Sequence, residues 1–256
     1  MKELDLAIKT AKKAGTFLVA SLARTKTKTS KGKSDWVTNI DVEVENLIRI
    51  DLQNNFPEYG FSGEESSRVK GKSKLEWIVD PIDSTDNFIH QLPHFTTTIA
   101  LMQGEKPILG VIYEPLAANL FYACKDKGAF LNNKRIHVSP IKNVSEALFF
   151  SVPGNREGDD MEEGVRIYNA LLQLRTSMKS WGSVALEVAY IAAGQAEAAA
   201  YVFNDPYSLP AAKIILEEAG GTMTTLQGDS WNQKSASVLA SNEILHKTLL
   251  KHLQKF

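Results

Sequence analysis

The sequence has a single cysteine, a net charge close to zero and no long apolar run, and each of these features excludes a class of protein. It has one cysteine, Cys124, in 256 residues, so no disulfide can form within the chain, and we expect a reducing, cytoplasmic location. The net charge of −1 provides no global field to attract nucleic acid. No apolar run reaches the roughly 20 residues needed to cross a membrane, and charged residues interrupt the first segment, so we expect no signal peptide. We therefore expect neither a membrane nor a nucleic-acid partner.

One local stretch departs from this balance of charge. Between residues 24 and 33 the basic side chains outnumber the acidic ones: Arg24, Lys26, Lys28, Lys31 and Lys33. A solvated loop is the simplest interpretation, because most runs of like charge are solvated surface. The alternative is a flexible lid or an arm that attracts anions.

Apolar periodicity predicts alternating layers of helix and sheet. Helical spacing is found in residues 4–22, 38–52, 165–174, 184–193 and 209–219 and near the C-terminus, with Thr38 as an N-cap. Strand-like runs are found in residues 77–79, 96–102, 108–113, 119–124, 147–152, 223–226 and 237–240. We expect an α+β fold with an N-terminal half (1–145) and a C-terminal half (146–256) in one compact unit.

The most informative stretch is a short buried strand that ends in acidic residues. Trp77, Ile78 and Val79 lead directly into Asp80, a proline, and then Asp83. A strand end fixes such carboxylates rigidly, so both can converge on a hard cation such as Mg²⁺. The hydroxyl residues that follow, Ser84 and Thr85, would lie at a helix start, where free N–H groups favour phosphate. An ordinary turn capped by aspartate is the alternative, and Glu64 in a nearby Gly-Glu-Glu-Ser segment argues against it.

At this point the sequence resembles the inositol monophosphatase family of Mg²⁺-dependent, lithium-sensitive phosphatases. The resemblance covers nearly the whole chain, and the motifs occur in the family's order, in residues 37–41, 63–66, 80–88, 182–186 and 216–221. It implies a layered α/β/α/β/α sandwich of the inositol monophosphatase and sugar phosphatase type. Homodimers are common in the family, so we also expect a homodimer.

The resemblance assigns roles to individual residues. The Mg²⁺ ligands would be Glu64, Asp80, the carbonyl of Ile82, and Asp83. Thr85 and Glu64 would orient the attacking water, with Asp41 supporting Thr85. Substrate contacts would come from Asp83, the backbone N–H groups of Ser84 and Thr85, and the second-half residues Gly182, Ser183, Val184, Tyr201 and Ser208.

Three positions depart from the family pattern. Ser84 stands where the family usually has glycine, which tolerates positive φ. Ser208, ten residues before Glu218, replaces an acid that binds a further metal and a substrate hydroxyl. Tyr201, seven residues before Ser208, replaces an acid that contacts the inositol ring in many members. Asp205 either caps the following helix, the simpler interpretation, or substitutes for the missing ligand.

The resemblance predicts hydrolysis of a small phosphate monoester, such as inositol monophosphate or another polyol or sugar phosphate, by a metal-activated water. The alternative is a catalytically impaired binding or regulatory protein on the same fold, because Ser208 replaces a metal-ligand acid.

Overall fold

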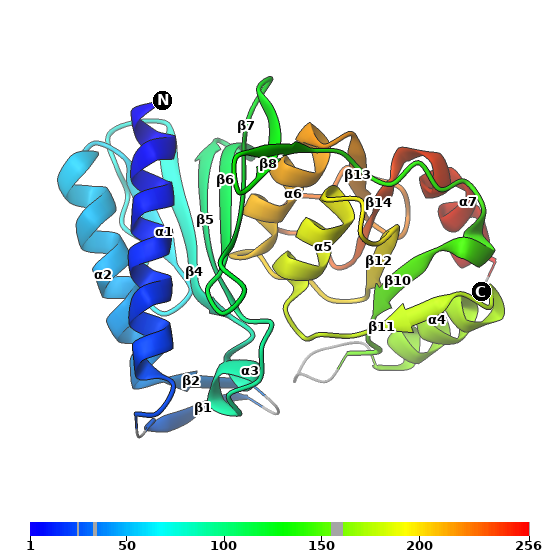
Figure 1. The fold of residues 1–256 in the computed structure, drawn as a ribbon, viewed down its shortest axis with the longest axis horizontal. Helices are drawn as coiled ribbons and strands as arrows, with labels where there is room; N and C mark the ends of the chain where they lie inside the picture. The colour runs from blue at the N-terminus through cyan, green and yellow to red at the C-terminus, as the bar shows by residue number, and fades with distance from the viewer. Residues whose placement is uncertain (25, 33–34, 155–160, 256) are drawn as a thin grey trace.

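A computed structural model describes residues 1–24, 26–32, 35–154 and 161–255. The chain forms five layers, which confirms the predicted α/β/α/β/α arrangement (Figure 1). Helices α1 (Lys2–Ser21) and α2 (Asn39–Asn55) form the first layer, next to a seven-stranded sheet. Helices α5 (Val184–Ala192) and α6 (Leu209–Glu218) separate this sheet from a five-stranded one, and α4 (Met161–Gln173) and α7 (Glu243–Leu253) form the last layer.

The seven-stranded sheet is mostly an antiparallel meander. Its strands follow the chain order β3-β4-β5-β6-β7-β8-β9, with β3 and β4 parallel and every later neighbour antiparallel. The bounds are β3 Gly60–Gly63, β4 Leu75–Asp83, β5 Thr96–Gln103, β6 Lys106–Glu114, β7 Asn119–Cys124, β8 Gly128–Leu131 and β9 Lys134–Ile136.

The five-stranded sheet has the order β11-β10-β12-β14-β13. Its bounds are β10 Leu148–Ser151, β11 Ser177–Lys179, β12 Ala198–Tyr201, β13 Gly221–Thr224 and β14 Val238–Asn242. The sequence did not predict β12, because three successive alanines carry no strand signature, yet this buried strand lies in the middle of the sheet. The expected boundary near residue 145 falls in the short 3₁₀ helix η1 (Val144–Glu146), just before β10.

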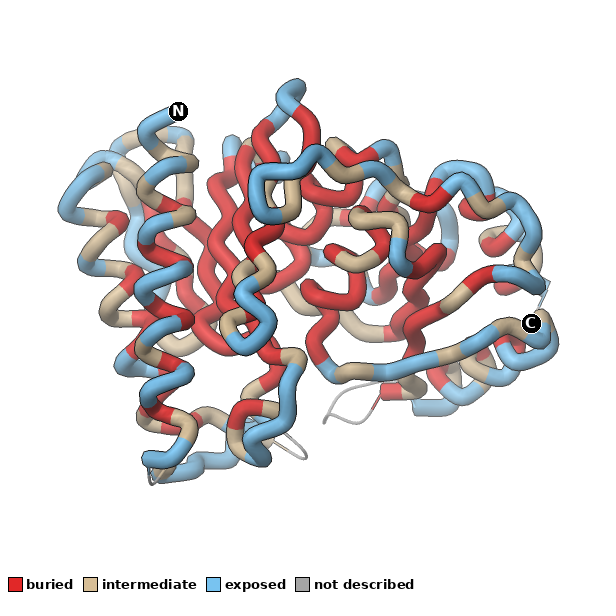
Figure 2. The backbone as a smooth tube through the Cα atoms, in the orientation of Figure 1, coloured by how far each residue is buried: buried red, intermediate tan, exposed pale blue. Residues whose placement is uncertain are grey.

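Burial follows the layers, with exposed residues concentrated on the outer helices and connecting turns (Figure 2). Small residues let α1 approach the first sheet closely: Ala7, Ala11 and Ala14 are buried, and a Cβ on Gly15 would lie 2.5 Å from the Tyr113 ring. Within the described part of the chain, no helix is long and apolar enough to span a membrane.

The basic segment is not the loop that the sequence predicts. Residues of this run form β1 (Lys28–Gly32), which pairs antiparallel with β2 (Asp35–Thr38) in a separate two-stranded sheet. β1 consists of Lys, Thr, Ser and Gly and is exposed along most of its length, so it shows no apolar alternation from which a strand could be predicted. Lys33 lies outside the described residues, and Lys31 projects toward the acidic residues described below.

Candidate active site

Three aspartates converge where the two halves of the chain meet. Asp80 and Asp83 come from the end of β4, and Asp205 precedes α6. One carboxylate oxygen from each lies within 4.8 Å of the other two. Asp80 and Asp83 are buried and Asp205 is half-buried, and carboxylates this close repel one another unless a proton or a cation intervenes. An all-oxygen set of this kind fits a hard divalent cation such as Mg²⁺.

A bulge in β4 positions the first two of these aspartates. Asp80 is opposite Thr98 and Asp83 is opposite Thr96, so β4 has one more residue than β5 across this interval. The hydroxyl of Thr97 donates to the carbonyl of Pro81 (2.9 Å), and the backbone N–H of Ile82 donates to Asp80 Oδ1 (2.9 Å). These bonds fix the turn between the two aspartates.

Asp83 is also held from the second half of the chain. The Ser183 hydroxyl donates to Asp83 Oδ2 (2.5 Å), and the backbone N–H of Ala185 donates to the same oxygen (3.0 Å). Ser183 is the N-cap of α5 and is fully buried. The segment before α5 therefore supports a candidate metal ligand.

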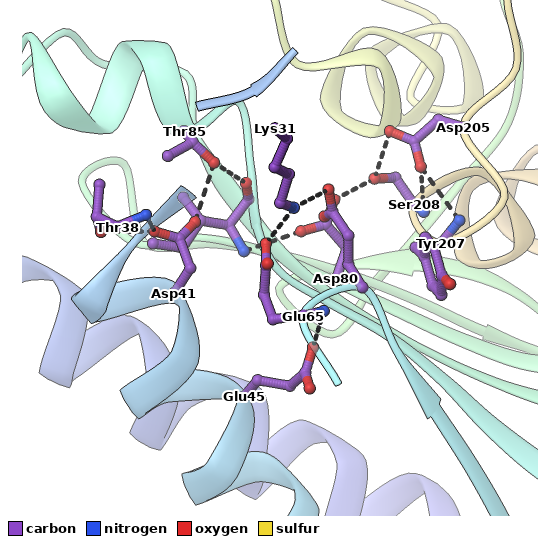
Figure 3. Close-up of polar contacts among 12 residues, drawn as sticks. Lys31, Thr38, Asp41, Glu45, Glu65, Asp80, Thr85, Asp205, Tyr207 and Ser208 are labelled. Atoms are coloured by element: carbon purple, nitrogen blue, oxygen red, sulfur yellow. Dashed lines mark hydrogen bonds and ion pairs between the residues drawn. The ribbon is translucent and has the colours of Figure 1, made fainter. Parts of the chain in front are cut away.

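Asp205 is both a turn cap and a member of the acidic group (Figure 3). Its Oδ1 accepts the backbone N–H groups of Tyr207 (3.1 Å) and Ser208 (2.9 Å). The Ser208 hydroxyl contacts Asp80 Oδ2 and lies 3.1 Å from Asp205 Oδ2. The simpler interpretation of Asp205 as a cap is thus incomplete, because its carboxylate also lies with the two β4 aspartates.

Glu64 lies beside the aspartate group, on the segment that follows β3. Its Oε1 is 3.0 Å from the Lys31 ammonium, which is also 2.6 Å from Glu65 Oε1. Glu45 of α2 accepts the backbone N–H of Glu65 (2.7 Å), and a Cβ on Gly63 would lie 2.3 Å from the Glu45 carboxyl carbon. Glycine at position 63 therefore lets this segment approach α2.

Burial dominates the electrostatics of the acidic group. It raises the pKa of Asp80 well above its ordinary value, and the charges of Glu64, Asp205 and Asp83 raise it further. The pKa of Glu64 is raised by burial and by Asp205, against the lowering effect of Lys31. Burial also raises the pKa of Glu65 to about 7. A bound divalent cation would favour the ionised forms, so proton release and metal binding are coupled here.

Two threonine hydroxyls near the aspartate group donate to the carboxylate of Asp41. Thr85, the first residue of α3 (Thr85–Ile89), donates from Oγ1 to Asp41 Oδ1 (3.0 Å) and lies 3.3 Å from the carbonyl of Ile82. Asp41 Oδ2 accepts the hydroxyl (2.6 Å) and the backbone N–H (2.8 Å) of Thr38, in the predicted cap of α2. Burial raises the pKa of Asp41, and the hydrogen bonds from Thr38 and Thr85 oppose this effect.

Ser84 takes the backbone conformation that favours glycine. Its φ and ψ are 75° and 65°, in the left-handed region, where a non-glycine residue is strained by about 1 kcal/mol. Gly182, with φ of 85°, packs against it, and a Cβ there would lie 3.2 Å from the Ser84 hydroxyl. The departure from glycine at position 84 therefore places a side chain against the 181–183 segment.

These groups line a cavity of about 310 Å³. The lining includes the aspartate group and its neighbours: Glu64, Asp80, Ile82, Asp83, Ser84, Thr85 and Asp205. The other lining residues of the second half are Val152, Ser180, Trp181, Gly182, Val184, Glu187 and Phe203, and Trp36, Asp86 and Asn87 complete the lining.

Eight of the twelve predicted site residues line this cavity: Glu64, Asp80, Ile82, Asp83, Ser84, Thr85, Gly182 and Val184. The other four lie behind it, and each contacts a lining residue. Asp41 binds Thr85, Ser183 binds Asp83, Tyr201 binds Glu187, and Ser208 binds Asp80 and Asp205. The direct contacts of all twelve with metal or substrate stay predictions.

Sequence reasoning missed Glu187, and it did not assign Lys31 to the site. A signal for Glu187 was present, because it is the one charged residue in the otherwise apolar helix α5. Lys31 offered no such signal, since the residues before it in β1, Lys28, Thr29 and Ser30, are exposed and polar.

Comparisons with known proteins agree with this geometry. The model of the inositol monophosphatase family matches residues 2–256. The chain is 36% identical to an inositol-1-monophosphatase of Caulobacter vibrioides, over 88% of this chain and 89% of the relative, and 32% identical to the Nus factor SuhB of Vibrio cholerae, over 98% and 96%. Among solved structures, the suhB protein of Bartonella henselae superimposes with a TM-score of 0.95 at 29% identity, covering 100% of this chain and 99% of that one. The Thermotoga maritima IMPase gives 0.90 at 31% identity, covering 100% and 98%. The chain therefore belongs to the inositol monophosphatase family.

Proposed function

We propose that this protein hydrolyses a small phosphate monoester of a polyol or sugar with the help of Mg²⁺. The observation that carries the proposal is the presence, in the lining of one cavity, of three convergent aspartates and of Thr85, which Asp41 holds from behind. Mg²⁺ held by Asp80, Asp83 and Asp205, with Glu64 nearby, would lower the pKa of a bound water and offset charge on the phosphoryl oxygens.

The chain's own residues supply orientation for the attacking water. Thr85 donates its hydroxyl proton to Asp41, so its oxygen is left to accept a hydrogen bond from a water in the cavity. Glu64 lines the same cavity and can act as the general base that takes the other proton of this water. Attack at phosphorus then breaks the bond to the alcohol oxygen, which takes up a proton from solvent water, while Glu64 returns its proton to solvent, so the products are the alcohol and inorganic phosphate.

Phosphate release from myo-inositol 1-phosphate and from related sugar phosphates, with Mg²⁺ or with EDTA, tests the proposal. We expect Mg²⁺-dependent turnover. Asp83→Asn should abolish it through loss of an anionic ligand. Thr85→Val keeps the side-chain shape and should retain Mg²⁺ binding, but should lower kcat by about 10²-fold. Failure of the wild-type protein to hydrolyse any ester would refute the proposal.

A second candidate, a regulatory binding role, is favoured by the relatives named Nus factor SuhB. The sequence argument for an impaired enzyme was the missing acid at Ser208. Asp205 answers that argument, because it places a carboxylate with Asp80 and Asp83. Turnover in the assay above would favour the hydrolase. Its absence, combined with intact Mg²⁺ binding, would favour the binding role.

A further inference from the structure

Glu187 is a buried acid for which the proposed chemistry has no use. It lies in the middle of α5, where its helix neighbours are apolar, and it is 2% exposed. Glu187 nevertheless lines the cavity, together with other residues of the second half of the chain. An acid is costly to bury without a partner or a function, so its contacts decide what it does.

The protein donors to Glu187 leave part of the carboxylate unused. Oε1 accepts the backbone N–H groups of Trp181 (2.5 Å) and Gly182 (3.3 Å). Within the described part of the chain, Oε2 has the hydroxyl of Tyr201 as its donor. Each carboxylate oxygen accepts about two hydrogen bonds, so Oε1 is satisfied and Oε2 retains one acceptor position.

Tyr201 is placed to hold Glu187 and not to contact a ligand itself. It is the last residue of β12, is 1% exposed and is not among the residues that line the cavity. Its hydroxyl therefore fixes Oε2 from behind. Among the other second-half residues that line the cavity, Val152, Val184 and Phe203 are apolar, Ser180 offers only a neutral hydroxyl, and the Asp205 carboxylate lies with Asp80 and Asp83.

We propose that Glu187 is the specificity residue of this cavity, accepting a hydrogen bond from a hydroxyl on the alcohol part of the phosphate ester. The inference rests on the proposed function and narrows it to hydroxyl-rich esters, in which a donor is present besides the phosphate. An ester without hydroxyl groups would leave a buried acceptor unpaired and would bind less well. Tyr201 is then a positioning residue that acts through Glu187.

A matched pair of esters isolates this contact. Myo-inositol 1-phosphate and cyclohexyl phosphate share a six-membered carbon ring and differ in the ring hydroxyls. We expect the wild-type protein to prefer the inositol ester at least about tenfold in kcat/KM. Glu187→Gln keeps an oxygen for the two backbone N–H groups but loses the acceptor at Oε2. It should therefore reduce the preference about tenfold, through KM for the inositol ester, while the kcat/KM for cyclohexyl phosphate changes less than about twofold.

Tyr201→Phe is the matched control, because it leaves the Glu187 carboxylate in place. Because Tyr201 positions that carboxylate, we expect Tyr201→Phe to reduce the preference by about threefold, less than Glu187→Gln reduces it. Equal losses on both esters in Glu187→Gln would show a structural role and overturn the inference. A preference lost in Tyr201→Phe but kept in Glu187→Gln would overturn it as well.

Binding measurements separate this inference from the proposed function. Calorimetric titration of both esters into Mg²⁺-loaded protein, with and without Glu187→Gln, reports recognition even if turnover is absent. Selective loss of inositol-ester affinity in Glu187→Gln supports the inference whatever the turnover, and an unchanged affinity ratio refutes it. Failure of the wild type to hydrolyse either ester would count against the proposed function alone.

Discussion

Asp205 provides a test in which capping and metal binding give different results. Asp205→Asn keeps an oxygen that can accept the N–H groups of Tyr207 and Ser208, and removes the charge. Asp205→Ala removes both the charge and the cap. If Asp205 is a metal ligand, the two variants should lose Mg²⁺ binding alike. They should differ in stability by about 1 kcal/mol, the usual worth of such a cap.

In the metal-free protein, removal of the Asp205 charge should increase the free energy of unfolding, because it relieves repulsion among the aspartates. Two unit charges 4.8 Å apart, the largest separation in the aspartate group, repel by about 3 kcal/mol at an effective dielectric constant of about 20. Burial raises the pKa of Asp80 well above its ordinary value, so Asp80 takes up a proton readily. This proton reduces the repulsion that remains among the aspartates. We therefore expect Asp205→Asn to stabilise the metal-free protein by about 1 to 2 kcal/mol.

Urea unfolding at pH 7.5 with EDTA and with Mg²⁺ measures both effects. A Mg²⁺ concentration of about 100 times Kd stabilises the wild type by about 2.7 kcal/mol. Weakening of Kd by about a hundredfold would reduce that gain in either variant to about 0.4 kcal/mol. If both variants keep the full Mg²⁺ stabilisation, Asp205 is a cap and not a ligand, and the reasoning is wrong.

Three further predictions concern other residues of the site. Burial raises the pKa of Glu187 from 4.5 to about 7, so the folded state holds this proton more tightly than the unfolded state does. The proton therefore contributes to the free energy of unfolding in full below about pH 4.5, and this contribution is lost as the pH rises through 7. Wild type in EDTA should thus lose about 2 to 3 kcal/mol more than Glu187→Gln between pH 5 and 8 in urea unfolding, and parallel pH profiles would contradict this. Ser84→Gly should be neutral or stabilising by up to about 1 kcal/mol in thermal unfolding, because it relieves the positive φ, and a clear loss would show that the Ser84 hydroxyl has a stabilising contact. Lys31→Met leaves Glu64 and Glu65 without their cation, so it should destabilise the metal-free protein by about 1 kcal/mol and increase the stabilisation by Mg²⁺, which differential scanning calorimetry would detect or exclude.

The part of the site that the sequence predicts well is the part built by one continuous segment. The strand end at Asp80, the bulge and Asp83 are local, and the cap at Thr38 follows from residues next to it. Strong periodicity likewise predicts helices such as α1 and α6 within a few residues. Here chemistry and spacing along the chain decide the structure, and both can be read without tertiary information.

What the sequence does not predict depends on contacts between distant segments. Asp205 and Ser208 are close to Asp80 because α6 packs between the sheets, and the residue count alone suggests a missing acid. Lys31 meets Glu64 through a hairpin with no apolar pattern. The alanine strand β12 is defined by its neighbours β10 and β14 and not by its own side chains.

The origin of the three aspartates has a consequence for how the molecule is assembled. Asp80 and Asp83 end a strand of the seven-stranded sheet, whereas Asp205 follows β12 of the five-stranded sheet. A cation bound by all three would be a cross-link between the sheets, so neither sheet alone would form the complete ligand set. We expect metal affinity to report the docking of the two halves, and chelation to loosen their junction before either sheet unfolds.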